Sequence, residues 1–117
     1  MEGGVVLEGF LHKRGRLRGD MVRRWYRLLD NGELVWQQDK ASEVKGRLSL
    51  SPETTLGPGA EYAREELYGF ALEDGKGRTR ELLAPSRGDR ELWLHGMCSV
   101  IAVLGNDVEA VREVRQR

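Results

Sequence analysis

The chain has 117 residues, one cysteine, and equal numbers of basic and acidic side chains, 19 of each. This length predicts a single domain that can bury a core without the disulfides or metals that folds below about 40 residues usually need. The balanced charge argues against a nucleic-acid-binding protein, because such domains usually carry a basic excess. The lone cysteine favours a reducing compartment.

Membrane contact, if any, is expected to be peripheral. No apolar run approaches the roughly 20 residues that a transmembrane helix requires. The first nine residues, MEGGVVLEG, lack the pattern of a signal peptide, and the N-terminal acylation pattern also fails. A cytoplasmic protein is therefore expected.

The first half of the chain alternates between apolar and polar residues as β-strands do. Strands are predicted at residues 5–13, 22–29, 34–37 and 47–50. Asp30, Asn31 and Gly32 make a hairpin turn between the second and third strands. In the second strand the alternation places Arg24 and Tyr26 on one face and Arg23 and Trp25 on the other.

The next segment is interrupted by Pro52 and by Gly57, Pro58 and Gly59, so only a short strand at 54–56 is expected there. Further strands are predicted at 68–72 and 78–84, joined by a turn at 74–77.

After Pro85 the period changes to that of a helix. Ser86 followed by Asp89 is typical of a helix start, and Gly105 with Asn106 is typical of a helix end. One apolar stripe recurs at spacings of four, three and four, in Trp93, Met97, Val100 and Leu104. We therefore expect one domain over residues 1–106, followed by a charged tail or helix extension over 107–117.

This order of elements predicts a mainly β fold with one C-terminal helix. Seven short antiparallel strands joined by tight turns can close into a bent barrel or sandwich, and an amphipathic helix can cap it by burying its apolar stripe.

The chain resembles the pleckstrin-homology domain family over roughly residues 5–104. The first strand is most similar to that of the protein kinase B pleckstrin-homology domain. The motifs that carry the resemblance are Glu8–Gly15, Arg24–Leu28, Lys45–Leu48, Phe70–Leu72, Arg78–Ala84 and the helix residue Trp93. The resemblance implies a seven-stranded bent barrel capped by the helix, and a cytoplasmic membrane-binding module with a role in signalling or membrane trafficking.

Positive charge is concentrated between the first two strands. Seven basic residues fall within fifteen positions, and only Asp20 opposes them; they are Lys13, Arg14, Arg16, Arg18, Arg23, Arg24 and Arg27. Arginine holds phosphate oxygens in pairs, and clustered basic residues bind anionic membranes. The pattern predicts a basic hairpin that binds an anionic phosphate surface.

The resemblance assigns individual roles within this region. Lys13, at the end of the first strand, and Arg24, ahead of the aromatic pair of the second strand, match positions that contact phosphoinositides, and Arg78 matches a further basic position. Trp36 stands where a phosphate-contacting tyrosine is common, and Val22 stands where a basic residue is common. Arg14, Arg16, Arg18 and Arg23 are the accompanying lipid-binding candidates, and Leu17 is the candidate for membrane insertion.

Two functions stay open at this point. The first is a membrane-targeting domain that binds anionic phospholipid head groups, chiefly phosphoinositides but with phosphatidylserine as an alternative. The second is a protein-interaction scaffold with weak or no lipid binding. A monomer is expected in either case.

Arg80 stands out because alternation with Leu82 and Ala84 turns it inward, where an unpaired guanidinium is costly. It is expected to reach the barrel mouth or to pair with an acid.

Catalysis and bound cofactors are not expected. His12 is expected to be an exposed strand residue, and His95 and Cys98 lie on the helix, without the spacing of a metal site or the surroundings of a nucleophile.

Overall fold

The computed structural model describes residues 4–14 and 20–106, which form seven strands and one helix. The elements are β1 (Val5–Arg14), β2 (Met21–Leu29), β3 (Glu33–Gln37), β4 (Val44–Ser49), β5 (Thr55–Tyr62), β6 (Leu67–Glu73), β7 (Thr79–Ala84) and α1 (Arg87–Gly105). The predicted class, mainly β with one C-terminal helix, is confirmed.

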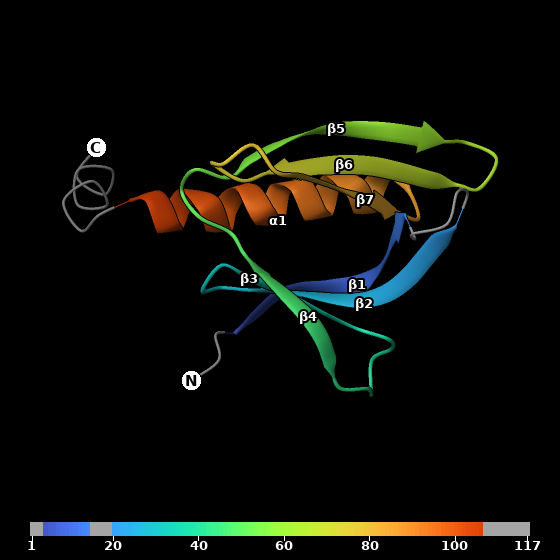
Figure 1. Ribbon diagram of the computed structural model, residues 1–117, viewed down its shortest axis with the longest axis horizontal. Helices are drawn as coiled ribbons and strands as arrows, with labels where there is room; N and C mark the ends of the chain where they lie inside the picture. Colours follow the sequence, from blue (N-terminus) through green and yellow to red (C-terminus); the bar gives the residue numbers. More distant parts are fainter. Residues whose placement is uncertain (1–3, 15–19, 107–117) are drawn as a thin grey trace.

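All seven strands belong to one antiparallel sheet in the order β4-β3-β2-β1-β7-β6-β5. The sheet folds back on itself between β1 and β7, where His12 pairs with Leu83. As a result, β1–β4 form one layer and β5–β7 form the other (Figure 1). Because β4 and β5 are the two edges of the sheet, the barrel stays open between them.

The helix buries its predicted stripe between these two layers. Trp93, Met97 and Val100 are buried in the same core as Leu11 of β1 and Phe70 of β6. Apolar residues of both layers thus meet on one helix face, which is why the helix runs alongside both in Figure 1.

The helix begins where the sequence predicts. The Ser86 hydroxyl oxygen accepts a hydrogen bond of 3.0 Å from the Asp89 backbone N–H, so it caps a free donor of the first turn. The helix ends at Gly105. Residues 107–117 lie outside the described residues, so the predicted tail or helix extension stays a prediction.

The fifth strand corrects the sequence-based interpretation. It was expected only at 54–56, but β5 runs through Pro58 for eight residues. β5 is an edge strand, and an edge strand tolerates proline because the missing N–H can lie on the side without a neighbouring strand. The pairing of β5 with β6 shifts register between Pro58 and Glu61, which absorbs the irregular segment.

Two glycines bring β5 and β6 unusually close. A Cβ added to Gly59 would lie 2.7 Å from the Gly69 carbonyl carbon, and one added to Gly69 would lie 2.6 Å from the Ala60 carbonyl oxygen. Gly59, which seemed to interrupt a strand, is therefore one of the two glycines that allow this pair of strands to pack.

The fourth strand also differs from the prediction. β4 begins at Val44 instead of Arg47, and Leu50 follows the strand as a buried core residue. Gly46 conceals the start of this strand in the sequence, because glycine is rare in strand interiors. Its role is steric, since a Cβ at Gly46 would overlap the Trp36 indole.

Candidate functional site

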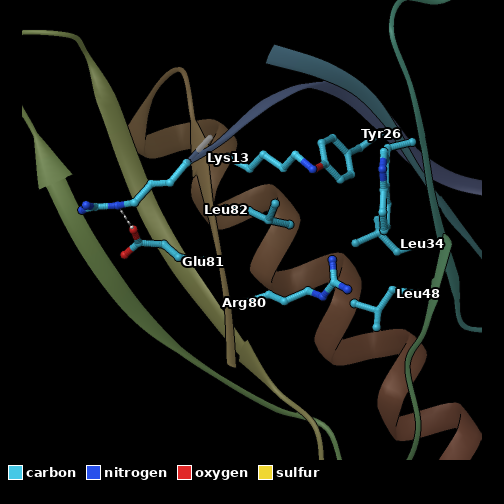
Figure 2. A pocket seen from close by; sticks show the side chains of 9 residues that line it. Lys13, Tyr26, Leu34, Leu48, Arg80, Glu81 and Leu82 are labelled. Carbon is cyan, nitrogen blue, oxygen red and sulfur yellow. Dashed lines mark hydrogen bonds and ion pairs between the residues drawn. The ribbon is translucent and has the colours of Figure 1, made fainter. Parts of the chain in front are cut away.

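A cavity of about 260 Å³ opens between the two layers of the sheet. Side chains from β1, β2, β3, β4 and β7 line it. In Figure 2, Leu34 and Leu48 lie opposite Leu82 and Arg80. The residues that shape it are Lys13, Tyr26, Leu34, Trp36, Leu48 and Arg80. Strands that are far apart in the sequence thus contribute to one hollow.

Two cations converge at this cavity over the same aromatic ring. The Lys13 Nζ lies 6.0 Å from the centroid of the Trp36 ring, and the Arg80 Cζ lies 5.5 Å from it. Each such contact contributes about 0.5–1 kcal/mol at an exposed site. Within the described part of the chain neither cation forms an ion pair. Both positive charges are therefore available to an anion.

Arg80 reaches the mouth of the barrel, as expected. Its residue is exposed although Leu82, two positions later on the same face, is buried. Figure 2 shows its guanidinium pointing into the space between Leu82 and Leu48. Arg80 was not among the residues predicted to bind lipid. The alternation of residues along β7 was the signal that could have identified it.

Tyr26 forms the inner wall of the cavity. Burial raises the pKa of its phenol to about 12, and the positive charges of Arg80 and Arg24 partly oppose this rise. Figure 2 shows the Lys13 side chain extending toward the Tyr26 ring. At neutral pH the phenol is protonated and uncharged, so the inner wall adds no negative charge to oppose an anionic ligand.

This raised pKa predicts a loss of stability in alkali. Above the ordinary tyrosine pKa of 10, the unfolded chain ionises at this position while the folded chain does not. The free energy of unfolding should therefore be fully retained below pH 10 and fall by about 2–3 kcal/mol as the pH rises to 12. Denaturant titrations of the native protein and of Tyr26→Phe should differ in this window. Equal pH dependence in the two proteins would contradict the assignment.

Arg14 borders the cavity, but its charge is already engaged. Its Nε lies 3.3 Å from the Glu81 carboxylate, and its guanidinium lies 5.2 Å from the centroid of the Tyr62 ring. A dashed line in Figure 2 marks this ion pair at the labelled Glu81. Glu81 also accepts a hydrogen bond from the Ala60 N–H at 2.9 Å, which fixes its carboxylate.

The two adjacent arginines of β2 lie on opposite faces, as the alternation predicts. Arg24 pairs with Leu11 and so shares the face of Lys13. Its Nη1 donates to the Arg23 carbonyl oxygen at 3.0 Å, and it does not line the cavity. Arg23 lies on the outer face, with its guanidinium 3.8 Å from the centroid of the Phe10 ring.

Arg78 lies beside the cavity instead of in it. Its Nε contacts the Asp74 carboxylate at 3.2 Å. Backbone N–H groups of Arg78 and Lys76 donate to the same carboxylate and lower its pKa. Arg78 and Arg80 both border a neighbouring hollow of about 100 Å³, which shares Leu48 with the larger cavity.

Of the sequence-predicted residues, Lys13 and Trp36 meet in the cavity, and Arg24 lies close enough to influence its inner wall. Arg16, Leu17 and Arg18 lie outside the described residues, so their predicted roles stay predictions.

On the outer face of the sheet, the structure corrects the expectation that His12 is exposed. The residue is half-buried and not exposed, and its Nδ1 has no hydrogen-bond partner among the described residues. Burial and the neighbouring charge of Arg23 lower its pKa, so the imidazole is neutral at pH 7.

The described residues contain no group of three His, Cys, Asp or Glu side chains placed to hold a metal ion. Within the same residues, no helix combines the length and the apolar character needed to cross a bilayer.

Comparison with known proteins agrees with this architecture. The family model described as "PH domain" matches residues 5–102. Mouse pleckstrin-2 is 34% identical over 96 residues, which is 80% of this chain and 27% of that protein. The chain thus spans about a quarter of the length of this curated relative.

Solved structures are similar in fold. A solution structure of a pleckstrin homology domain matches with a TM-score of 0.69 and 21% identity, covering 92% of this chain and 95% of that one. The C-terminal PH domain of pleckstrin, crystallised in complex with D-myo-Ins(1,2,3,5,6)P5, matches with a TM-score of 0.69 and 18% identity. That match covers 91% of this chain and all of the other.

Proposed function

The chain belongs to the PH domain family, and on that premise we propose that it is a binding module, not an enzyme, that recognises anionic phospholipid head groups. The ligands foremost in this proposal are phosphoinositides. The bound state would hold the protein at the cytoplasmic surface of a membrane, as a peripheral monomer.

The observation that carries the proposal is the convergence of Lys13 and Arg80 over Trp36. Two like charges held at one opening repel each other, and a phosphate placed between them relieves that repulsion. Charge-assisted hydrogen bonds from lysine and arginine to phosphate are about twice as strong as neutral ones. Because the cations come from the two layers of the sheet, one phosphate would bridge β1 and β7.

The basic hairpin adds a second contribution in this proposal. Arg24 stands beside the cavity, and Arg16 and Arg18 precede it in the sequence, between β1 and β2. Each basic side chain near an anionic leaflet contributes about 1 kcal/mol in a salt-dependent way. Leu17 between them would enter the interface once the arginines contact the lipid head groups.

Phosphoinositides are favoured over phosphatidylserine by the two cations at the mouth of the cavity, because two positive charges without ion-pair partners suit the phosphates of a multiply charged head group. The solved complex of the pleckstrin C-terminal PH domain with D-myo-Ins(1,2,3,5,6)P5 supports the same class of ligand. The hairpin charges alone would accept any anionic lipid.

Sedimentation with a panel of vesicles at low and at physiological salt tests this function. We expect selective binding to phosphoinositide vesicles that persists at the higher salt, since a partly enclosed contact is screened less than an exposed one. Broad binding that is lost at the higher salt would assign the interaction to the hairpin charges and favour phosphatidylserine. Absence of binding to every anionic vesicle at low salt would contradict the proposal and favour a protein-interaction scaffold.

A further inference from the structure

The cavity between the two layers has an apolar part that a phosphate group alone would not use. Besides the two cations, three leucine side chains line it, namely Leu34, Leu48 and Leu82. Leu34 and Leu82 belong to the buried core, with 1% and 5% of their surface exposed. The cavity is therefore charged at its mouth and apolar at its base.

Its size is sufficient for an apolar group as well as an anion. A cavity of about 150 Å³ lined by aliphatic side chains can hold benzene, and this one measures about 260 Å³. A fully hydroxylated ring placed against the leucines would give up hydrogen bonds to water without replacing them, which is unfavourable. A hydrocarbon group in the same place would lose nothing of that kind and would remove apolar surface from water.

We infer that this cavity binds small amphipathic anions, in which a phosphate or carboxylate is attached directly to an aromatic ring or a short alkyl group. The anionic group pairs with Lys13 and Arg80, and the hydrocarbon part lies against Leu34, Leu48 and Leu82 beside the Trp36 ring. This inference rests on the proposed function only because both assign the binding of the anionic group to Lys13 and Arg80. It adds that soluble amphipathic anions compete with membrane head groups for one site.

The surroundings of the cavity leave no unpaired negative charge at its mouth to oppose an anionic ligand. Glu81 is the one carboxylate that borders the cavity within the described part of the chain, and Arg14 and the Ala60 N–H occupy its oxygens. The Tyr26 phenol, whose pKa is raised, stays uncharged at neutral pH. Nothing at the opening therefore opposes an anion that approaches Lys13 and Arg80.

Calorimetric titration of the whole chain with phenyl phosphate and with inorganic phosphate tests the inference. Burying a ring of the size of a phenylalanine side chain is worth more than a factor of ten in a binding constant. We expect phenyl phosphate to bind at least tenfold more tightly than inorganic phosphate. Equal affinities for the two probes would overturn the inference.

Two variants locate the apolar contact. Leu48→Phe fills the cavity from β4, and Leu48→Gln replaces the apolar surface with a polar group of similar length. Both should reduce the affinity ratio of phenyl phosphate to inorganic phosphate toward one. This ratio is measured on the same folded population, so partial unfolding of a variant does not alter it. A ratio that stays at its native value in both variants would overturn the placement of the ring.

Vesicle binding on the same preparation separates the two claims. If phosphoinositide vesicles bind and phenyl phosphate shows no advantage, the proposed function stands and the amphipathic ligand is wrong. If phenyl phosphate shows its advantage and no vesicle binds, the cavity has the inferred chemistry and the membrane function is wrong. If both hold, phenyl phosphate should release the protein from vesicles as its concentration passes its own dissociation constant.

Discussion

Replacing both Lys13 and Arg80 by alanine is expected to lower the affinity for phosphoinositide vesicles by about two orders of magnitude. Each residue would donate a hydrogen bond to a charged group, worth about 1.5–3 kcal/mol, and 1.4 kcal/mol corresponds to a factor of ten. The two side chains come from different layers of the sheet but meet over one ring. Vesicle sedimentation over a range of lipid concentrations measures the loss.

The matched control removes the same charge elsewhere. Arg47 lies on β4, paired with Glu33, and Arg64 lies in the turn between β5 and β6; neither lines the cavity. Arg47→Ala with Arg64→Ala should therefore cost less than tenfold. Equal losses in the two double variants would show that binding depends on overall charge and not on the cavity.

The pair that the sequence alone favours is expected to have a smaller effect. Lys13→Ala with Arg24→Ala removes one cavity cation and one neighbour, because the Arg24 Nη1 is bonded to the Arg23 carbonyl oxygen and does not line the cavity. Its loss of vesicle affinity should fall between those of the Lys13 and Arg80 double variant and the control.

Truncating the helix tryptophan is expected to have the largest effect on stability. Trp93 is 3% exposed and packs in the core that joins the two layers of the sheet, with its ring against Gly9. Trp93→Ala should lower the free energy of unfolding by about 3–5 kcal/mol, the cost of emptying a large buried site. Denaturant unfolding followed by circular dichroism measures this change.

The adjacent residue supplies the control for this truncation. Leu92 precedes Trp93 on the same helix but is 57% exposed. Leu92→Ala should change the free energy of unfolding by no more than about 0.5 kcal/mol, because it loses little buried surface. Comparable losses for both variants would mean that α1 is not held to the sheet by its Trp93 face.

The fold was largely predictable because its signals are local. Alternation along β1 and β2, the turn that ends at Gly32, and the stripe around Trp93 each depend on residues within a few positions of one another. These features require no knowledge of distant partners. Their order along the chain also carried the resemblance to the PH family.

What could not be predicted depends on partners far apart in the sequence. The length of β5 follows from its place at the sheet edge and from the close approach of Gly59 to Gly69. The pairing of Arg14 with Glu81 joins residues 67 positions apart. No pattern near Arg14 indicates that its charge is engaged, so the basic hairpin seemed to offer more free cations than it does.

The candidate site was likewise predictable only where local patterns in the sequence indicate it. Lys13 and Trp36 were predicted from the family positions that they match, and the inward turn of Arg80 followed from alternation along its strand. The meeting of all three residues at one cavity depends on the fold of the sheet between β1 and β7. That bend is a property of the whole sheet and not of any one strand.

The central claim is that anionic head groups bind at the cavity over Trp36, and an NMR titration tests it most directly. Adding inositol hexakisphosphate to the isotopically labelled chain should shift the Trp36 indole N–H signal and the backbone signals of Lys13 and Arg80 first. Signals near Arg87, at the start of α1, should stay in place. Shifts confined to the region of Arg87, or no shifts at Lys13, Trp36 and Arg80, would contradict the account.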